Sequence, residues 1–445
     1  METRLTSGSI TGNLMRFSLP YMLSYFLQTL YGMADLFIIG QFCTTADVTA
    51  VSVGSQIMHM LTVMIVGLAM GSTVLIGKTV GEGKSKALPR IIGNTFTLFG
   101  IIAVAATIAL LLLRVSIVRV MSTPAEAVDA TVRYVTVCFI GIPFITAYNI
   151  FSSVFRGLGD SKRPMYFIAI ACFTNIVLDY VFIGMLGLGT AGAALGTTLS
   201  QTLSVIVSFV AFRRMDGYPA VSGSDFRPDR GIFGTILRVG IPVCLQDGFV
   251  QIAFLTLTII ANKRGLNDAA AVGIVEKMIG FMFIVPSSML SAVSVLAAQN
   301  IGAGKPERAK KTLFSAVAAA VGFGCVMTAA SLVFADQLVG LFEKNPEVIR
   351  LGGEYMRSYV FDCIFAGIHF SFSGYFCACG HSGLSFMHNS ASILLARIPL
   401  AYILSGKYPA TLFPMGLGAP IGSLLSSIIC IVAFIILQKH EKTTV

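Results

Sequence analysis

The sequence predicts an all-α polytopic membrane protein with twelve transmembrane helices in two six-helix lobes. Hydrophobic residues make up 55% of the chain and charged residues only 12%, whereas a soluble domain carries about 25% charged residues. The apolar residues form stretches of roughly 20 or more, which is the length that crosses a bilayer. Short motifs also recur in the two halves of the chain at a nearly constant offset. The chain therefore cannot cover itself with a wettable surface, and its two halves are related.

Twelve apolar stretches are long enough to span the membrane. In chain order, we expect spans at 14–38, 49–77, 90–113, 132–155, 164–184, 190–212, 232–261, 270–297, 311–335, 353–378, 384–404 and 414–437. The polar stretch 213–230 separates the first six spans from the last six. It predicts an N-terminal lobe over 1–212, a cytoplasmic linker over 213–230 and a C-terminal lobe over 231–445.

Three pairs of motifs relate the two halves. Gly81-Glu82-Gly83-Lys84 recurs as Gly302-Ala303-Gly304-Lys305, Gly159-Asp160-Ser161 as Gly380-His381-Ser382, and Leu19-Pro20 as Ile241-Pro242. Because six spans precede the second copy, both halves have the same orientation and the repeat is parallel. Many secondary transporters are duplicated bundles of this kind, with the substrate path at the repeat interface. Transport is therefore the first hypothesis.

The distribution of basic residues predicts the orientation. Lys and Arg are more than twice as frequent in the segments that share a side with the termini as in the loops on the other side. Cytoplasmic loops carry this excess, so we expect both termini in the cytoplasm of a bacterial or archaeal cell. The net charge of +10 does not indicate a nucleic-acid partner, because the basic residues lie in short loops between apolar stretches.

Among the ionisable residues of the predicted spans, seven are candidates for a position inside the membrane, five acids and two bases. An ionisable side chain at the centre of a bilayer costs about 2.5–3.5 kcal/mol, so it usually faces a cavity or a partner. Acids outnumber bases, and this surplus favours a cavity that accepts cations. The acids are Asp35, Asp179, Asp247, Glu276 and Asp362, and the bases are Lys277 and Arg397.

The first half carries the denser group of polar residues. Gln28, Tyr31 and Asp35 share one face of the first span, and Asn175 and Asp179 share one face of the fifth. With Thr197 of the sixth span, the oxygens of Asp35, Asn175 and Asp179 suit Na⁺ or a proton relay. Four alternatives stay open. Asp35 is exposed at the outer interface, Asn175 and Asp179 form a structural hydrogen bond, Thr197 serves the backbone or helix packing, and Gln28 and Tyr31 pack in the ordinary way with a satisfied polar tip.

In the second half, Arg397 can pair with Glu276 or Asp362 within the membrane. Such a pair is either part of a secondary charged network of Glu276, Asp362 and Arg397, or it only stabilises the lobe. Pro20, early in the first span, removes a backbone hydrogen bond and predicts a bend there. That bend is either a hinge or a static feature of the helix.

Motifs for other functions are missing from the sequence. There is no G-x-x-x-x-G-K-[ST], H-E-x-x-H or G-x-S-x-G, and the five His residues are scattered. We therefore expect neither an enzyme nor a cofactor beyond the coupling ion. A regulated channel or receptor stays an alternative, although the sequence shows neither a filter-like motif nor a large sensory domain. The loop after the second span lacks the Asp-Arg-x-Gly-Arg pattern that is typical of major-facilitator-type transporters.

The order of motifs resembles the multidrug and toxic compound extrusion (MATE) family over essentially the whole chain. The motifs that carry the resemblance are Phe17-Ser18-Leu19-Pro20, Asp35-Leu36-Phe37-Ile38-Ile39-Gly40, Gly81-Glu82-Gly83-Lys84, Phe155-Arg156-Gly157-Leu158-Gly159-Asp160-Ser161, Ala298-Gln299-Asn300-Ile301-Gly302-Ala303-Gly304-Lys305 and Arg397-Ile398-Pro399-Leu400. The resemblance implies two six-helix lobes around a V-shaped central cleft. It also implies export of small organic compounds, often cationic and aromatic, in exchange for H⁺ or Na⁺, by a protein that works as a monomer.

The resemblance also implies roles for single residues. Asp35, Asn175, Asp179 and Thr197 match the cation or proton site of the prokaryotic branch similar to DNA-damage-inducible exporters, and Gln28, Tyr31 and Asn149 match polar positions of the same lobe. A second branch has its key acids in the seventh, eighth and tenth helices. Asp247, Glu276 and Asp362 lie in those helices in a different register, and Gln251 lies nearer the expected place of the seventh-helix acid. The alternative function is a flippase for lipid-linked sugars or an exporter of narrow specificity.

Overall fold

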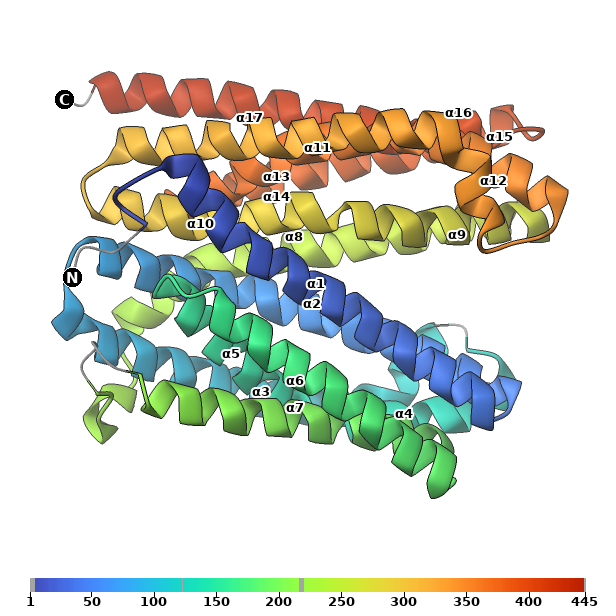
Figure 1. Cartoon of the computed structure of the whole chain (residues 1–445), viewed down its shortest axis with the longest axis horizontal. Coiled ribbons are helices and arrows are strands. Elements are labelled where there is room, and N and C mark those ends of the chain that lie inside the picture. The colour runs from blue at the N-terminus through green and yellow to red at the C-terminus, as the bar shows by residue number, and fades with distance from the viewer. Residues whose placement is uncertain (1–4, 122, 216–219, 444–445) are drawn as a thin grey trace. The chain divides into compact units, whose positions relative to one another are not determined.

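The computed structural model describes residues 5–121, 123–215 and 220–443, and within them it contains helices and no strands. The chain folds as two compact units (Figure 1). Unit 1 is Leu19–Gly240, and unit 2 is the segment up to Ser18 together with the chain from Ile241 onward. Both boundaries lie directly before the repeated Leu19-Pro20 and Ile241-Pro242 motifs. The lobe boundaries at 212 and 231 stay a prediction.

Unit 1 contains the helices of the first half of the chain. They are α1 (Ile10–Phe42, from Leu19 onward), α2 (Thr45–Gly81), η1 (Ser85–Ala87), α3 (Leu88–Val120), η2 (Ala125–Ala127), α4 (Val128–Ile140), α5 (Ile142–Gly157), α6 (Lys162–Asp179), η3 (Tyr180–Met185), α7 (Gly189–Arg213), η4 (Gly223–Phe226) and the start of α8 (Arg230–Asn262).

Unit 2 contains the start of α1 and the helices of the second half. They are the rest of α8, α9 (Leu266–Met282), α10 (Ile284–Gly302), α11 (Pro306–Gly340), α12 (Pro346–Tyr359), α13 (Asp362–Ala378), α14 (Ser382–Ser392), η5 (Ile393–Arg397), α15 (Ile398–Lys407), α16 (Phe413–Gly416) and α17 (Gly418–Thr443).

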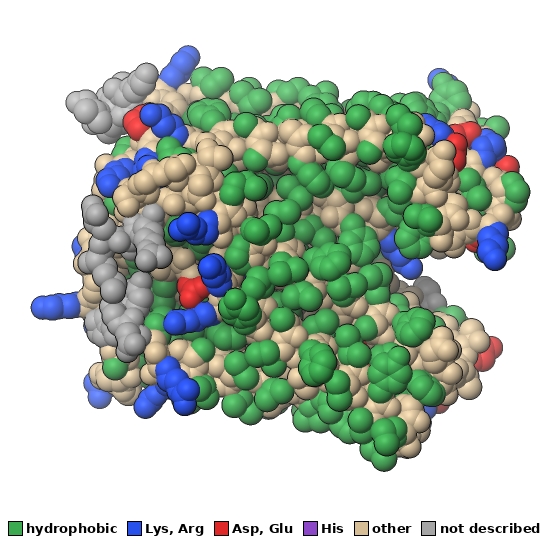
Figure 2. Space-filling model, in the orientation of Figure 1, with side chains coloured by type: hydrophobic (Ala, Val, Ile, Leu, Met, Phe, Trp, Pro, Cys, Tyr) green, Lys and Arg blue, Asp and Glu red, His purple; other side chains and the backbone are tan. Residues whose placement is uncertain are grey.

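All twelve predicted spans fall within these helices. Among the described residues, nine helices are long and apolar enough to cross a membrane, and two bent helix pairs bring the number to eleven. The remaining predicted span, 384–404, lies in the continuous helical run α14–η5–α15. That run carries His388, Asn389 and Arg397 and is therefore less apolar than the others. Figure 2 shows hydrophobic side chains along the helices and charged side chains gathered at their ends, the distribution that a bilayer requires.

The bent pairs are the predicted fourth span of each half. α4 and α5 meet at an angle of 48°, and α12 and α13 meet at 42°. Pro143 lies in the first turn of α5, where its missing N–H costs no helical hydrogen bond. Pro20 and Pro242 instead lie inside α1 and α8. α1 stays a single helix through Pro20. One turn later, the hydroxyl of Ser24 donates a 2.8 Å hydrogen bond to the carbonyl of Pro20.

The repeated glycine motifs are helix ends. Gly83 and Gly304 have φ of 68° and 69°, and Gly159 and Gly380 have φ of 94° and 80°. Residues with a side chain rarely adopt these left-handed conformations, which reverse the chain after a helix. The sequence similarity between the halves therefore marks the same turns in the two units.

The inter-lobe linker is held against α3. Residues 216–219 of the predicted linker lie outside the described residues. The Asn94 amide donates to the carbonyl of Asp225 at 3.1 Å and accepts from the N–H of Asp229 at 2.7 Å. The backbone N–H groups of Ile232 and Gly231, together with Arg90, hold the pKa of Asp229 below its ordinary value. These contacts fix where α8 begins.

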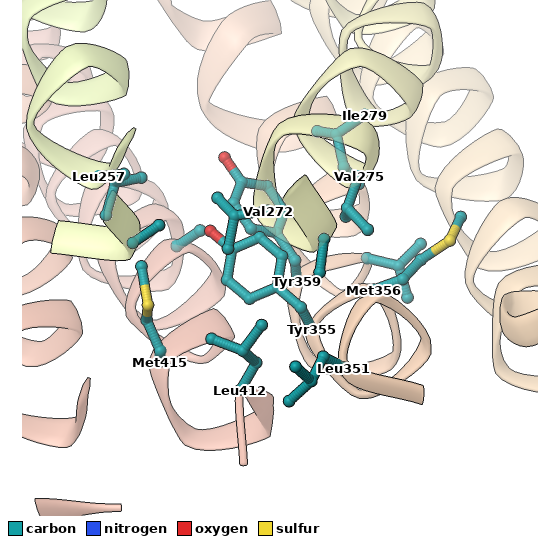
Figure 3. Packing of buried hydrophobic residues seen from close by; sticks show 14 of the residues in the cluster. Leu257, Val272, Val275, Ile279, Leu351, Tyr355, Met356, Tyr359, Leu412 and Met415 are labelled. Atoms are coloured by element: carbon teal, nitrogen blue, oxygen red, sulfur yellow. The ribbon is translucent and has the colours of Figure 1, made fainter. Parts of the chain in front are cut away.

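A large apolar cluster of unit 2 packs around α12. The rings of Tyr355 and Tyr359 are fully buried with centroids 5.5 Å apart. Figure 3 shows them in the middle of the cluster, among side chains of α8, α9 and the segment at α16. This packing fixes the end of α12 and hence the position of Asp362, the first residue of α13.

Candidate ion-binding site

Three helices of unit 1 bring the predicted polar residues together. Asp35 of α1, Asn175 and Asp179 of α6, and Thr197 of α7 are all buried, with 2%, 0%, 0% and 7% of their surface exposed. The Thr197 hydroxyl donates to Oδ2 of Asp35 at 3.5 Å, and the Asn175 amide donates to Oδ1 of Asp179 at 3.4 Å. Asp35 is therefore not exposed at an interface. The Asn175–Asp179 hydrogen bond, which was the alternative to an ion site for these two residues, is present.

The two carboxyl groups are direct neighbours. The carboxyl of Asp35 interacts with that of Asp179 and with the side chains of Asn175 and Thr197. One oxygen of each acid, Oδ1 of Asp35 and Oδ2 of Asp179, is buried without a hydrogen-bond partner among the described residues, and so is Oδ1 of Asn175. Buried acceptors without donors are costly. A proton or a cation placed among these three oxygens would remove that cost.

The other predicted residues of unit 1 differ in their distance from the acids. The Tyr31 hydroxyl is buried beside Asp35 and Thr197. The Asn149 amide donates to the carbonyl of Ile145 at 2.8 Å, so one of its two N–H donors is used within α5. Gln28 is half-buried and, within the described residues, forms no hydrogen bond to the acids.

Gly196 of α7 makes the site possible and was missed from the sequence. A Cβ atom at this position would lie 2.2 Å from Oδ1 of Asp179 and 3.5 Å from Nδ2 of Asn175. A Cβ atom on Gly192, one turn earlier, would lie 3.1 Å from the backbone carbonyl carbon of Phe182. The spacing Gly192-x-x-x-Gly196 is the signal for close helix approach in membranes, and it identifies the face of α7 that meets α6.

The backbone next to Asp179 is irregular. α6 ends at Asp179 and passes directly into the π-helical turn η3. Such turns occur mostly as single insertions in α-helices and frequently at functional sites. Because a π-helical turn has more residues than an α-helical turn, the residues after Asp179 point in directions that the 3.6-residue period of α6 does not predict.

The donor atoms suit an alkali ion or a proton. Within the described ranges, no group of three or more His, Cys, Asp or Glu side chains could hold a metal ion. Two carboxyls, one amide oxygen and one hydroxyl are hard oxygen ligands. They can bind Na⁺ or share a proton between neighbouring acids.

In unit 2, Arg397 pairs with Asp362 and not with Glu276. Nη2 of Arg397 lies 2.6 Å from Oδ2 of Asp362 and 3.3 Å from Oγ of Ser423. Both charged side chains are buried, with 9% and 0% exposure. Glu276 accepts a 3.4 Å hydrogen bond from Thr258, and its other oxygen is buried with no partner in the described ranges. Asp362 is thus neutralised by Arg397, whereas Glu276 has no direct counterion among the residues described.

The surroundings of Arg397 resemble those of Asp179. Arg397 is the last residue of the π-helical turn η5. A Cβ atom on Gly418 of α17 would lie 2.8 Å from the Arg397 carbonyl, and one on Gly422 would lie 3.1 Å from the Arg397 Cβ. In both units, a charged residue beside a π-helical turn packs against a Gly-x-x-x-Gly face, with an acid in one unit and a base in the other.

The two remaining candidates lie on α8. Asp247 and Gln251 are half-buried and one turn apart, so they share a face. Asp247 lies near Cys377 of α13. Within the described residues, Asp247 has no basic partner at ion-pair distance, so it is a second intramembrane acid without a counterion.

The buried ion pair gives a stability prediction. Arg397→Gln is expected to lower the free energy of unfolding by about 3–5 kcal/mol, because Asp362 would remain buried without its partner. Arg397→Met combined with Asp362→Leu should cost much less, since both charges are removed. Thermal and denaturant unfolding in detergent would measure the difference.

The matched control is Arg350→Gln. Arg350 pairs with Glu347 and Glu354 while 46% of its side chain is exposed. Exposed pairs contribute at most about 1 kcal/mol. An Arg397→Gln protein as stable as Arg350→Gln would show that the buried pair does not hold unit 2 together.

The comparisons with known proteins agree with this architecture. The MatE family model matches the chain twice, over residues 20–181 and 242–403. The first match begins at Pro20 and the second at Pro242, so the repeat inferred from the motifs is confirmed.

Several relatives are similar over nearly their whole length. The "Probable multidrug resistance protein YpnP" of Bacillus subtilis is 28% identical over 94% of this chain and 92% of its own length. The "Probable multidrug resistance protein YoeA" of the same organism is 24% identical, with 98% and 96% covered. A solved structure described as the outward-facing conformation of a multidrug resistance MATE family transporter superposes with a TM-score of 0.92. It is 24% identical and covers 99% of this chain and 98% of that one.

The double match covers more than half of the chain, and the predicted all-helical fold is confirmed. The family consists of transporters. The chain therefore belongs to the MatE family of membrane transporters, and it is not an enzyme.

Proposed function

We propose that this protein is a secondary active multidrug efflux antiporter, which exports organic cationic or aromatic compounds in exchange for H⁺ or Na⁺. The observation that carries the proposal is the buried pair Asp35–Asp179, with oxygens on both acids and on Asn175 that have no partner among the described residues. The names of the relatives YpnP and YoeA as multidrug resistance proteins support the choice of substrates.

The carboxyl pair supplies the coupling chemistry. Two neighbouring carboxylates away from water repel each other, so the site retains both charges only when it also holds a cation. A proton on either acid, or Na⁺ among Asp35, Asn175, Asp179 and Thr197, relieves the repulsion. Occupancy therefore changes the relative stability of transporter conformations, and a ligand shifts such an equilibrium only by its differential affinity. The difference in ion affinity between the conformations of the transporter links the ion gradient to substrate movement.

The remaining polar positions belong to the substrate path in this proposal. The polar groups among the apolar helices come from Gln28, Tyr31 and Asn149 of unit 1 and from Asp247 and Gln251 of unit 2. Pro20 allows α1 to bend near its start, because no N–H of this residue ties the helix there. The protein works as a monomer in the cytoplasmic membrane, with both termini in the cytoplasm.

Ethidium efflux from proteoliposomes tests the function and identifies the ion. A pH gradient and a Na⁺ gradient are imposed separately on the wild-type protein, with protein-free liposomes as the control. We expect efflux to follow one of the two gradients and to stop when a matching ionophore collapses it. Efflux that ignores both gradients would contradict antiport, and no efflux of several cationic dyes would favour an exporter of narrow specificity.

A further inference from the structure

Among the described residues of unit 1, Arg156 is a cation without an acidic partner. It lies in the last turn of α5, and its guanidinium carbon is 4.3 Å from the centre of the Tyr21 ring. Its electrostatic neighbours are Tyr21, Tyr148 and Tyr25. No carboxylate of the described residues lies at ion-pair distance from it. Arg163, by contrast, pairs with Asp160 at 3.4 Å.

Two buried hydroxyls lie on the same side of α5 as Arg156. Tyr148 and Ser152 precede it by eight and four residues, so the three side chains follow one helical face. Tyr148 is 3% exposed and Ser152 is 1% exposed. Their two hydroxyls interact with each other, and neither has a hydrogen bond of good geometry to any other group in the part of the chain that the structure describes. The Tyr148 hydroxyl also lies close enough to Arg156 to feel its charge. The face thus presents a guanidinium and two hydroxyls that can donate to a ligand.

The fold itself does not require a cation at this position. Phe155-Arg156 recurs in the second half as Phe376-Cys377. Cys377 is buried, and its charged neighbour is the acid Asp247. The second unit thus fills the equivalent place on α13 without a positive charge. The contact with the Tyr21 ring helps unit 1 to tolerate the charge, but it provides no acceptor for the Tyr148 and Ser152 hydroxyls beyond each other.

We propose that Arg156, Tyr148 and Ser152 form an oxyanion site that takes a phosphate group. Guanidinium groups bind phosphate through paired, charge-assisted hydrogen bonds, and hydroxyls complete such a site as donors. Arg156 is one residue from the end of α5, which places the site at the membrane-surface end of the span. The phosphate comes either from a phospholipid headgroup or from a soluble phosphate ester. The site is separate from the acids on α1, α6 and α7, and it does not rest on the proposed antiport.

The test measures binding to the full-length protein after lipids are removed in neutral detergent. One arm adds sodium phosphate against NaCl at the same ionic strength. The other adds phosphatidylglycerol and follows its retention by native mass spectrometry. The thermal unfolding midpoint is recorded in both arms. We expect at least one probe to raise the midpoint of the wild-type protein and to bind with a measurable affinity.

The variants assign that binding to the three residues. Arg156→Gln should weaken it roughly 10- to 100-fold, and Tyr148→Phe, which keeps the ring, should weaken it roughly 3- to 10-fold. Lys162→Gln removes an exposed positive charge at the same end of the helices and should change binding less than about twofold. Binding of lipid alone assigns the site to a headgroup, and binding of inorganic phosphate assigns it to a soluble ester.

Two outcomes would overturn the proposal. One is a wild-type protein that binds neither probe. The other is equal binding by the wild-type, Arg156→Gln and Tyr148→Phe proteins. If Arg156→Gln does not fold, Tyr148→Phe and Arg156→Lys decide the matter, because each retains the packing around Tyr21.

Discussion

Asp179→Asn is expected to abolish gradient-driven efflux while the protein still folds and reaches the membrane. The amide keeps the size of the side chain and can still bond with Asn175, but it neither takes up a proton nor carries a charge for Na⁺. Asp35 then has no acid beside it, and the repulsion that ion binding relieves is gone. If the coupling free energy between ion and substrate lies at the upper end of the usual range, its loss lowers the rate of gradient-driven efflux by roughly 100-fold.

Ethidium efflux from proteoliposomes under the effective gradient measures this loss, with dye binding recorded in parallel. Asp129→Asn is the matched control, because Asp129 is an exposed acid in the first turn of α4 and is not among the side chains that interact with Asp35 or Asp179. This variant should transport normally. Asp35→Asn should behave like Asp179→Asn, since both acids belong to one site. Normal gradient-driven efflux by Asp179→Asn would show that coupling does not depend on this pair.

The sequence predicted the helices well because the membrane imposes strong local rules. Every span must be mostly apolar over about 20 residues and must satisfy its own backbone hydrogen bonds. The turns at Gly83 and Gly304 were recognisable because left-handed backbone favours glycine. The bends between α4 and α5 and between α12 and α13 were harder to predict. Only the first has a proline beside it, Pro143, and the second arises without one.

The composition of the site could also be predicted, but its geometry could not. The cost of burying Asp35 and Asp179 in a membrane is enough to mark both acids as candidates from their positions in the sequence. The partner of Arg397 stayed open between Glu276 and Asp362, because helical periodicity fails at the π-helical turn η5 that ends on Arg397. Side chains beyond such a turn point in directions that a regular 3.6-residue period does not give.

Gly196 shows a second reason why the sequence was not sufficient. A glycine within a helix has many causes, and only the position of α6 reveals that the missing Cβ leaves room for the carboxyl of Asp179. That dependence gives a sharp prediction. In Gly196→Ala, the new Cβ would lie 2.2 Å from Oδ1 of Asp179, far inside van der Waals contact. The carboxyl must move, and its neighbours Asp35 and Asn175 lose their present geometry.

We expect Gly196→Ala to reduce gradient-driven efflux by roughly 10- to 100-fold, since a displacement of about 1 Å in a polar site can cost as much as 100-fold. The same proteoliposome assay measures it, together with the dependence of the rate on ion concentration. The ion dependence should shift, because the substitution acts on the ligands of the ion and leaves their chemical identity unchanged. Overpacking should also lower the free energy of unfolding by about 1–3 kcal/mol.

Gly100→Ala is the control that separates these effects from a general intolerance of alanine in the helices. Gly100 lies inside α3, and a Cβ atom added to it would meet no described atom within 4 Å. Alanine is also favoured over glycine in a helix by about 1 kcal/mol, so this variant should fold and transport like the wild-type protein. If Gly196→Ala also does so with an unchanged ion dependence, the close contact between α7 and Asp179 has no part in coupling. If it instead keeps dye binding and loses only the response to the gradient, the space left by a single missing methyl group determines how the ion is held.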